Sequence, residues 1–314
     1  MPSGATRTAR RGAEGPGQRQ YSLLARDRRF GYLLVAPAVL VLLAITAYPL
    51  VYNLWNSFQN YVTTTGLPPT FNGVANYKRI LTDHQFVPAF VHTIGFTIVS
   101  VVVETLTGLG IALALNRPFR GRGLVRAAVF IPWAVPTVVS ARLWREMFDP
   151  QHGFVNYTLT TLHLPLGTTT WLGQTWTSWA AVLVADAWRN TPFMAIVLLA
   201  GLQVIPTDIY EAARIDGASA WQTFRRLTLP LLAPALMVAM IFRTLSSFLI
   251  FDVIYVMTGG GPGTSTSVLS YLDYQAFLTQ FDFGYGGAIA VVLAGVALLI
   301  AFAYVRAFRN EQPA

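Results

Sequence analysis

The chain has 314 residues, of which 54% are apolar and only 11% are charged, and its formal net charge is +8. Soluble domains carry about 25% charged residues, so this composition indicates a membrane protein. The absence of cysteine excludes disulfides, thiol catalysis and cysteine metal ligands, and the four histidines show no metal-ligand spacing. Because the basic residues flank apolar runs instead of forming a stripe, we predict no nucleic-acid partner. We also predict that this chain binds no metal and no cofactor.

Residues 1–29 form the first distinct region. They are rich in Gly, Ser, Pro and Arg, and their acidic residues are Glu14 and Asp27. A polar, charged segment of this kind cannot bury enough apolar surface to fold, so we predict a disordered basic tail.

Six apolar runs follow the tail. Each is close to the length of about 20 residues with which a helix crosses roughly 30 Å of hydrocarbon. Backbone groups in lipid must be satisfied within the segment, and the runs lack the alternation of barrel strands, so we predict an all-α membrane domain over residues 30–308. The predicted spans are 32–55, 92–115, 124–147, 179–202, 231–255 and 287–308, followed by a short tail at 309–314.

The basic residues predict the orientation of these spans. Lys and Arg concentrate in the tail, after the second span, after the fourth span and at the C-terminal end. The positive-inside rule places this side, and with it both termini, in the cytoplasm. Arg142 and Arg145, at the outer end of the third span, oppose the trend but do not reverse it.

The segment 205–230, between the fourth and fifth spans, predicts two short helices separated by a bend. Asp208 and Glu211 match a capping box at the start of the first helix, and Gly217 suits the left-handed residue that ends it. Ser219 and Gln222 repeat the capping box for the second helix. We predict that the second helix ends before Pro230, because proline disfavours continuation of the preceding turn.

Small residues surround the predicted bend, so another surface could approach its backbone closely. Tyr210, Ile215, Trp221 and Phe224 add apolar side chains around it. The local chemistry fits a docking surface for a partner, and it equally fits an amphipathic loop that lies against the protein's own helices.

A longer pattern in this segment resembles a known family. Glu211-Ala212-Ala213, three residues, Gly217, nine residues, Leu227, one residue and Leu229-Pro230 resemble the EAA signature of binding-protein-dependent ABC importer permeases, with Leu in place of the usual Ile. The resemblance covers nearly the whole chain after the tail and is closest to the sugar-importing branch, which includes maltose and glycerol-3-phosphate permease subunits. Three other stretches support it, namely 108–116, 148–156 and 251–271.

The resemblance implies a type I ABC importer permease bundle of six helices with a cytoplasmic coupling helix. In that family the EAA segment sits in a groove of the nucleotide-binding subunit, which implies contact by Glu211 and a bend at Gly217. It also implies a multi-pass protein of a prokaryotic cell membrane that works with a second homologous permease, cytoplasmic ATPase subunits and an extracytoplasmic solute-binding protein. The residues that we expect in the coupling contact are Glu211, Ala212, Ala213, Asp216, Gly217, Ala218, Trp221 and Phe224.

The sequence contains no motif for ATP hydrolysis. A P-loop needs a Gly-rich turn that ends in Gly-Lys-Ser/Thr, because its amides and lysine hold the phosphates. The single lysine, Lys78, lies in a predicted external loop. We therefore expect a transport subunit that is not an enzyme, with ATP and Mg bound by the partner ATPase.

Several polar residues fall within the apolar runs, where a charge at mid-bilayer costs at least about 2.5 to 3.5 kcal/mol. They are Glu104, Asp186, Arg189, Asn190, Arg243, Ser246 and Ser247. One interpretation is a polar path for a hydroxylated solute, and the other is pairing between helices, for instance Glu104 with Arg243 or Asp186 with Arg189. For the ionised residues we favour pairing. The residues that we assign to a substrate path are Trp133, Arg189, Asn190, Arg243, Ser246 and Ser247.

The favoured function is therefore the permease subunit of an ATP-driven importer for a sugar or sugar-like solute. Arg189 or Arg243 could also serve glycerol-3-phosphate or another small polar solute. An intramembrane glycosyl or prenyl transferase would need an acidic cluster at the interface, which the scattered aspartates do not form. An ion channel or proton-coupled carrier would need several carboxylates in series across the membrane, and Glu104 and Asp186 alone give little support for such a pathway.

Overall fold

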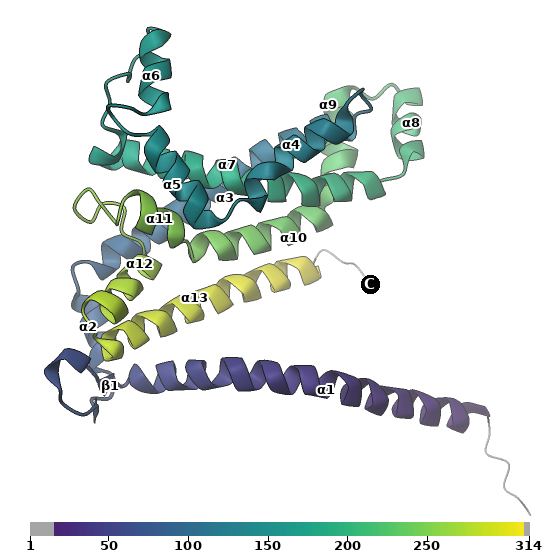
Figure 1. The fold of residues 1–314 in the computed structure, drawn as a ribbon. Coiled ribbons are helices and arrows are strands. Elements are labelled where there is room, and N and C mark those ends of the chain that lie inside the picture. The colour runs from purple at the N-terminus through teal and green to yellow at the C-terminus, as the bar shows by residue number, and fades with distance from the viewer. Residues whose placement is uncertain (1–15, 311–314) are drawn as a thin grey trace, which may run out of the picture. The chain divides into compact units, whose positions relative to one another are not determined.

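The computed structural model describes the backbone of residues 16–310 and the side chains of residues 31–307. The described chain is mostly helical and divides into two compact units, residues 1–53 and residues 54–314. Figure 1 shows the ribbon with its elements labelled. Residues 1–15 of the predicted basic tail, and residues 311–314 of the predicted C-terminal tail, lie outside the described part of the chain.

Helix α1 (Pro16–Asn56) dominates the first unit. Its part from Gly31 to Asn56 is long and apolar enough to cross a membrane. Residues 16–29 are helical, so the prediction of a disordered tail is wrong for this part of the chain. Gln, Arg, Leu and Ala are good helix formers, and here they lead without interruption into the apolar run.

The second unit holds all other elements, and those that position the candidate sites are long helices. In chain order they are β1 Gln59–Asn60, η1 Thr63–Thr65, β2 Thr70–Phe71, α2 Ala75–Thr82, α3 Phe86–Asn116, α4 Arg122–Ala134, α5 Thr137–Met147, α6 Phe154–Thr161, η2 Trp171–Gly173, α7 Thr175–Val204, α8 Thr207–Ile215, α9 Ala220–Thr223, η3 Phe224–Thr228, α10 Leu229–Phe248, α11 Asp252–Met257, α12 Leu269–Tyr274, η4 Gln275–Thr279 and α13 Phe283–Asn310. The strands β1 and β2 form a minimal antiparallel pair with Gln59 opposite Phe71.

Among the described residues, five helices are long and apolar enough to span a membrane, and the bent pair α4–α5 brings the possible total to six. The run 124–147, which we predict as one span, consists of two helices, with an angle of 96° between α4 and α5. Val135 is extended and Pro136 precedes α5. A residue before proline is pushed out of the helical region, and this explains the break.

The predicted fifth span, 231–255, is also interrupted. Helix α10 ends at Phe248, and α11 begins only at Asp252. The hydroxyl of Ser270 donates a hydrogen bond to the carbonyl oxygen of Ile250 within the gap. A side chain from α12 thus satisfies a backbone group that an unbroken helix would have satisfied internally.

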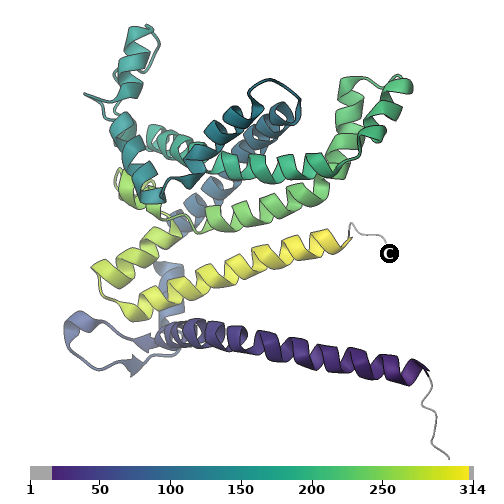
Figure 2. The same ribbon diagram turned by 45° about the vertical axis from the view of Figure 1, so that its right-hand side comes forward.

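Helices α3, α7 and α10 form the centre of the second unit, and they run side by side in Figure 1 and Figure 2. Close approach between α3 and α7 depends on Gly108, where an added Cβ would lie 2.6 Å from Cβ of Met194. Gly201 plays the same part between α7 and α10, because its added Cβ would lie 2.5 Å from Cβ of Ala235. Small residues are a common device for close helix packing in membranes.

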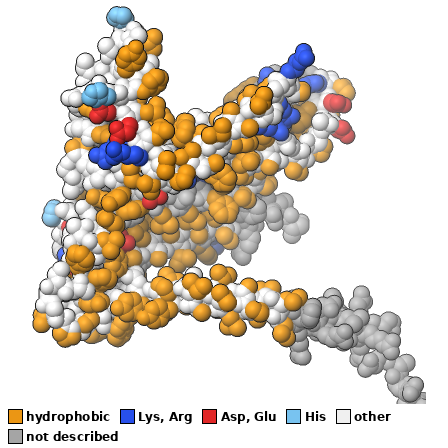
Figure 3. Space-filling model, viewed as in Figure 1, with side chains coloured by type: hydrophobic (Ala, Val, Ile, Leu, Met, Phe, Trp, Pro, Cys, Tyr) orange, Lys and Arg blue, Asp and Glu red, His pale blue; other side chains and the backbone are white. Residues whose placement is uncertain are grey.

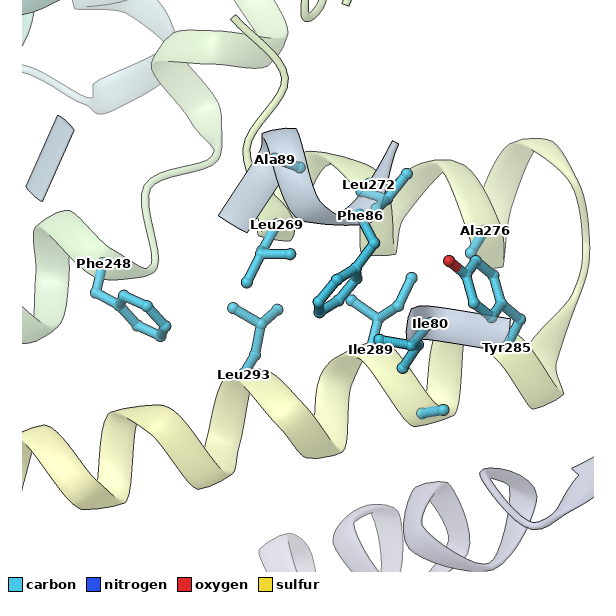
Figure 4. Close-up of a cluster of buried hydrophobic side chains, with 11 residues drawn as sticks. Ile80, Phe86, Ala89, Phe248, Leu269, Leu272, Ala276, Tyr285, Ile289 and Leu293 are labelled. Carbon is cyan, nitrogen blue, oxygen red and sulfur yellow. The ribbon is translucent and has the colours of Figure 1, made fainter. Parts of the chain in front are cut away.

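A cluster of buried apolar side chains joins α2, α12 and α13 to the start of α3. Figure 4 shows its buried side chains, with Phe86 lying between Leu269 and Ile289. Beside it, Arg79 on α2 pairs with Asp282 at 2.6 Å and lies 4.0 Å from the ring centroid of Tyr285. The cluster and this ion pair fix α2 against the first turns of α13.

The two ends of the second unit differ in their elements. Helices α8 and α9 lie at one end, and α2, α6, α11 and α12 lie at the other (Figure 1). Figure 3 shows Lys and Arg side chains gathered near α4 and α9, and a separate group of charged side chains and histidines near α5 and α6. Acidic side chains lie at the α8 end as well, so the long helices connect two ends that both carry charged side chains.

Candidate functional site

The segment 205–230 forms a helical protrusion made of α8, a bend and α9. Helix α8 begins after Pro206, and no side chain caps its first turn. The predicted capping box of Asp208 and Glu211 is therefore wrong. Pro206 starts the helix early and places Asp208 inside the first turn, where its carboxylate favours the helix N-terminus without capping it.

Gly217 makes the bend after α8, as we predicted. Its φ is +71°, in the left-handed region that suits glycine. The amide of Gly217 donates to the carbonyl of Arg214 at 3.1 Å, and the amide of Ala218 donates to that of Ala213 at 2.9 Å. These two bonds form a Schellman motif, which satisfies the last carbonyl groups of α8 and reverses the chain direction.

The second predicted capping box is confirmed. The amide of Ser219 donates to Oε1 of Gln222 at 2.8 Å, and the amide of Gln222 donates to Oγ of Ser219 at 3.3 Å. Helix α9 therefore begins immediately after the bend, and the angle of the protrusion is set by bonds between near neighbours in the sequence.

The predicted end of the second helix before Pro230 is wrong. A wider turn, η3, follows α9, and the chain then passes into α10 as one continuous helix from Ala220 to Phe248. In this turn the amide of Leu229 donates to the carbonyl of Phe224, five residues earlier. Pro230 lies in the first turn of α10, where its missing N–H is tolerated.

Most of the predicted coupling residues are accessible on this protrusion. Glu211, Ala212, Asp216 and Gly217 are exposed, Ala218 and Phe224 are partly buried, and Ala213 is buried. Trp221 is 66% exposed and stacks on Phe224, with 5.7 Å between ring centroids. Ile215 is 87% exposed. The protrusion leaves large apolar side chains in the open, which is typical of a surface that binds another protein.

A hollow lies between the two helices of the protrusion. Its volume is about 610 Å³, and its lining includes Ala212, Gly217, Ala218, Gln222 and Arg226. The small side chains on one wall leave backbone within reach of a partner, and Gln222 and Arg226 supply polar groups on the other.

A group of hydrogen-bonded polar side chains lies between α3, α7 and α10, and we call it the intramembrane polar network. It consists of Glu104, Asp186, Arg189, Asn190, Arg243 and Ser246. Glu104 is 0% exposed, and Arg243 and Asp186 are each 4% exposed. The network joins one residue of α3 to residues of the other two helices.

Arg243 is the centre of this network. Its Nε and Nη2 atoms donate to the two carboxylate oxygens of Glu104, the second at 2.8 Å, and Nη2 also donates to Asp186. A bidentate guanidinium–carboxylate pair is a strong, directional contact in a low-dielectric interior. The predicted pairing of Glu104 with Arg243 is confirmed. The predicted pairing of Asp186 with Arg189 is wrong, because Arg243 on α10 reaches Asp186 from across the bundle.

Asn190 and Arg189 extend the network toward the α4–α5 break. The amide of Asn190 donates to Oδ1 of Asp186 at 2.8 Å, and Arg189 Nη1 donates to Oδ1 of Asn190 at 3.1 Å. Nε of Arg189 donates to the carbonyl oxygen of Val135 at 3.1 Å. Arg189 therefore satisfies a backbone group in the extended stretch between α4 and α5, and the sequence alone gave no signal for this contact.

The residues assigned to a substrate path differ in the exposure of their side chains. Ser246 is exposed and accepts a hydrogen bond from Arg243 Nη1 at 3.0 Å, whereas Ser247 is fully buried and bonded to Ser100 of α3. Trp133 is 51% exposed and stacks near Phe193 with 6.2 Å between centroids. Asn190, Ser246 and Trp133 thus keep part of their surface accessible, whereas Ser247 holds α10 to α3.

One titratable group outside the candidate spans is perturbed without a partner. Burial raises the pKa of Asp273 on α12 to about 7. Among the described residues, its Oδ1 atom has no hydrogen-bond partner. By contrast, amide hydrogen bonds from His152 and Gln151 hold the pKa of the exposed Asp149 below its ordinary value. Within residues 31–307, no group of three His, Asp or Glu side chains could hold a metal ion.

Comparison with known proteins matches most of this chain to membrane components of transport systems. The model of the family "Binding-protein-dependent transport system inner membrane component" matches residues 106–310. The trehalose/maltose transport system permease protein MalF of Thermococcus litoralis is 42% identical over 90% of this chain and 95% of that protein. The trehalose transport system permease protein SugA of Mycobacterium tuberculosis is 40% identical, with 91% of each chain covered.

A more distant relative and a solved structure agree with these matches. The sulfoquinovosyl glycerol transport system permease protein SmoG of Agrobacterium fabrum is 37% identical over 91% of this chain and 92% of that protein. A chain of a bacterial ABC transporter involved in the import of the acidic polysaccharide alginate superposes with a TM-score of 0.78 at 23% identity, over 94% of this chain and 100% of that chain. At this identity the superposition shows a shared fold.

Proposed function

Because this chain belongs to the family of binding-protein-dependent transport system inner membrane components, we propose that it is the permease subunit of an ATP-driven importer for a neutral sugar of the trehalose or maltose type. The observation that carries the sugar class is the 42% and 40% identity to sugar permeases over nine-tenths of the chain. In this role the chain supplies the path across the membrane, and a separate ATPase supplies the energy.

The polar network supports a neutral solute. Arg243 is neutralised by Glu104 and Asp186, so a phosphate group would have to displace a carboxylate to bind there. The accessible groups are the hydroxyl of Ser246, the amide of Asn190 and the ring of Trp133. Hydroxyls and amides exchange hydrogen bonds with sugar hydroxyls, and an aromatic face packs against the apolar face of a sugar ring.

A phosphorylated solute such as glycerol-3-phosphate remains the second candidate. Arg189 contacts a backbone carbonyl and an amide, and no carboxylate pairs with it among the described residues. An anionic solute would therefore bind beside Arg189 and not beside Arg243.

The protrusion of α8 and α9 is proposed to transmit force from the ATPase. Glu211, Gly217 and Trp221 would lie in the contact, with the α8–α9 end in the cytoplasm, as the basic residues predict. Because α9, η3 and α10 form one continuous helix, a push at Ala220 reaches Arg243 through roughly 35 Å of helix. Movement of the protrusion would thus act directly on the polar network and alternate its access to the two sides.

The coupling role is tested in the complete complex, reconstituted in liposomes with its binding protein. Glu211→Ala is expected to lower solute uptake and solute-stimulated ATP hydrolysis together by about tenfold, because a polar contact in the interface is lost. Asp208→Ala is the matched control, since Asp208 is an exposed carboxylate on the same helix. If uptake and hydrolysis with Glu211→Ala equal those of the control, the coupling role is wrong.

The solute is tested separately. The purified binding protein is heated with trehalose, maltose and glycerol-3-phosphate, and the solute that it recognises raises its melting temperature. Uptake by the liposomes is then measured with the same three solutes. If only glycerol-3-phosphate stabilises the binding protein and only glycerol-3-phosphate is taken up, the neutral-sugar proposal is wrong and the second candidate is supported.

A further inference from the structure

Four aromatic rings gather where α11 meets α12, at the end of the second unit opposite the protrusion (Figure 1). They belong to Phe251, Tyr255, Tyr271 and Tyr274, and we call them the aromatic cluster. Every pair within the cluster has ring centroids between 5.1 and 6.5 Å apart. Two short helices that are separated by an eleven-residue loop thus present one continuous aromatic surface.

The cluster is held in place by its surroundings. An added Cβ on Gly260, whose φ is +80°, would lie 2.6 Å from Cε1 of Tyr271, so the loop backbone packs directly against this ring. The hydroxyl of Ser270, next to Tyr271, ties α12 to the carbonyl of Ile250 in the gap before α11. The indole of Trp179 on α7 holds the same loop through the carbonyl of Ser265 at 3.0 Å. The rings are therefore oriented before any ligand arrives.

The cluster is open on one side and carries polar groups. Tyr255 is 46% exposed, and its hydroxyl lies 3.5 Å from that of Tyr274. Rings that only fill a core are buried, whereas these rings are partly accessible and bring phenolic hydroxyls to their edges. A ring face beside hydroxyl donors and acceptors is the chemistry that recognises a sugar, which has apolar C–H faces and hydroxyl edges.

The position of the cluster relates it to the polar network. Phe251 follows Ser246 by five residues, across the gap between α10 and α11. A solute that enters from the α11–α12 end would reach the cluster before it reached Ser246. Aromatic residues also collect at membrane interfaces, where they anchor a helix without binding a solute. That role does not require rings that pack on one another or a loop that fixes them.

We propose that the aromatic cluster is an outer sugar-binding site, which receives the solute before it enters the polar network. The proposal rests on the proposed function, because it takes the imported sugar as its ligand. A sugar ring would stack on the exposed face of Tyr255, and the hydroxyls of Tyr255 and Tyr274 would exchange hydrogen bonds with the sugar hydroxyls.

The experiment measures binding of radiolabelled trehalose to the purified complete complex without the binding protein. Tyr255→Leu and Tyr274→Leu remove a ring, and Tyr255→Phe and Tyr274→Phe keep it. Tyr255→Leu is expected to raise the dissociation constant about three- to tenfold, because the stacking contact is lost, and Tyr255→Phe is expected to bind more tightly than Tyr255→Leu because it keeps the ring. Both Tyr274 variants remove a hydroxyl that bonds the sugar, so both are expected to weaken binding to a similar extent. Tyr157→Leu is the matched control, since Tyr157 is 71% exposed on α6 at the same end.

The outcomes separate this proposal from the function on which it rests. If the wild-type complex binds and imports trehalose and the leucine variants bind it equally well, the outer site does not exist and the importer assignment stands. If the leucine variants only reduce the amount of complex in the membrane, with unchanged affinity, the cluster is an interfacial anchor and the proposal is wrong. If the wild-type complex neither binds nor imports trehalose, the choice of sugar fails and the outer site fails with it.

Discussion

The intramembrane polar network and the protrusion of α8 and α9 satisfy their polar groups in opposite ways. At the centre of the network, bonds join residues far apart in the sequence, such as Glu104 and Arg243, which are 0% and 4% exposed. In the protrusion, bonds join residues three to five positions apart, as in the capping box of Ser219 and Gln222. The protrusion also leaves Trp221 largely exposed.

This difference separates what the chain completes by itself from what it offers to a partner. A buried charge must find its partner within the same bundle, because lipid offers none. The protrusion is instead stabilised locally and keeps its apolar side chains free. Changes in the network should therefore affect the amount of folded protein, and changes in the protrusion should affect transport while the protein remains folded.

The largest expected effect comes from Arg243→Met. This change leaves Glu104 and Asp186 buried without their cation, and breaking a buried pair in this way costs about 3 to 5 kcal/mol. We expect little assembled complex in the membrane, measured by size-exclusion chromatography and by the melting temperature of what remains. The triple variant Glu104→Gln, Asp186→Asn, Arg243→Met removes every charge of the group and should recover much of the assembly. Normal assembly of the single variant would show that the network does not hold the bundle together.

A smaller effect is expected from Gly217→Val at the bend of the protrusion. A β-branched residue at φ +71° is strained by about 1 to 2 kcal/mol, although open space surrounds the added Cβ. We expect normal assembly, with uptake reduced by about tenfold because the angle between α8 and α9 changes. Asn tolerates the left-handed region, so Gly217→Asn should retain most of the uptake. A loss of assembled protein comparable to that of Arg243→Met would contradict the distinction between the two regions.

The sequence predicted the protrusion better than the network, and the reason is the range of the bonds involved. The bend at Gly217 and the box at Ser219 depend on neighbouring residues, so their pattern is visible in the sequence. Asp208 failed as a cap because Pro206 offered a competing start two residues earlier. Asp186 has Arg189 three residues away on the same helix, yet it binds Arg243, which lies 57 residues away. Only the packing of α7 against α10 decides between these partners.

Breaks in the long helices also escaped prediction from composition. The run 124–147 is mostly apolar, and hydropathy alone describes it as one span. The break at Val135 and Pro136 follows from the restriction that proline places on the preceding residue. It is tolerated in part because Arg189 binds the carbonyl of Val135, a contact that depends on tertiary structure. The continuous passage through Pro230 depends likewise on the wider turn at Phe224–Thr228.

The smallest expected effect tests a carboxyl group that is partly buried without a partner, in contrast to Asp186. Burial raises the pKa of Asp273 to about 7 from an ordinary value of 3.8, so the folded protein keeps this proton at a pH where the unfolded chain has lost it. Stability should therefore fall as pH rises from about 4 to about 7 and then level off. Asp273→Asn removes this dependence, and it should raise the melting temperature of the complex more at pH 8 than at pH 5. We expect a gain of about 1 kcal/mol at pH 8, because partial access to water reduces the penalty. Equal shifts at both pH values would mean that Asp273 finds a partner in the assembled complex, as Asp186 does within the chain.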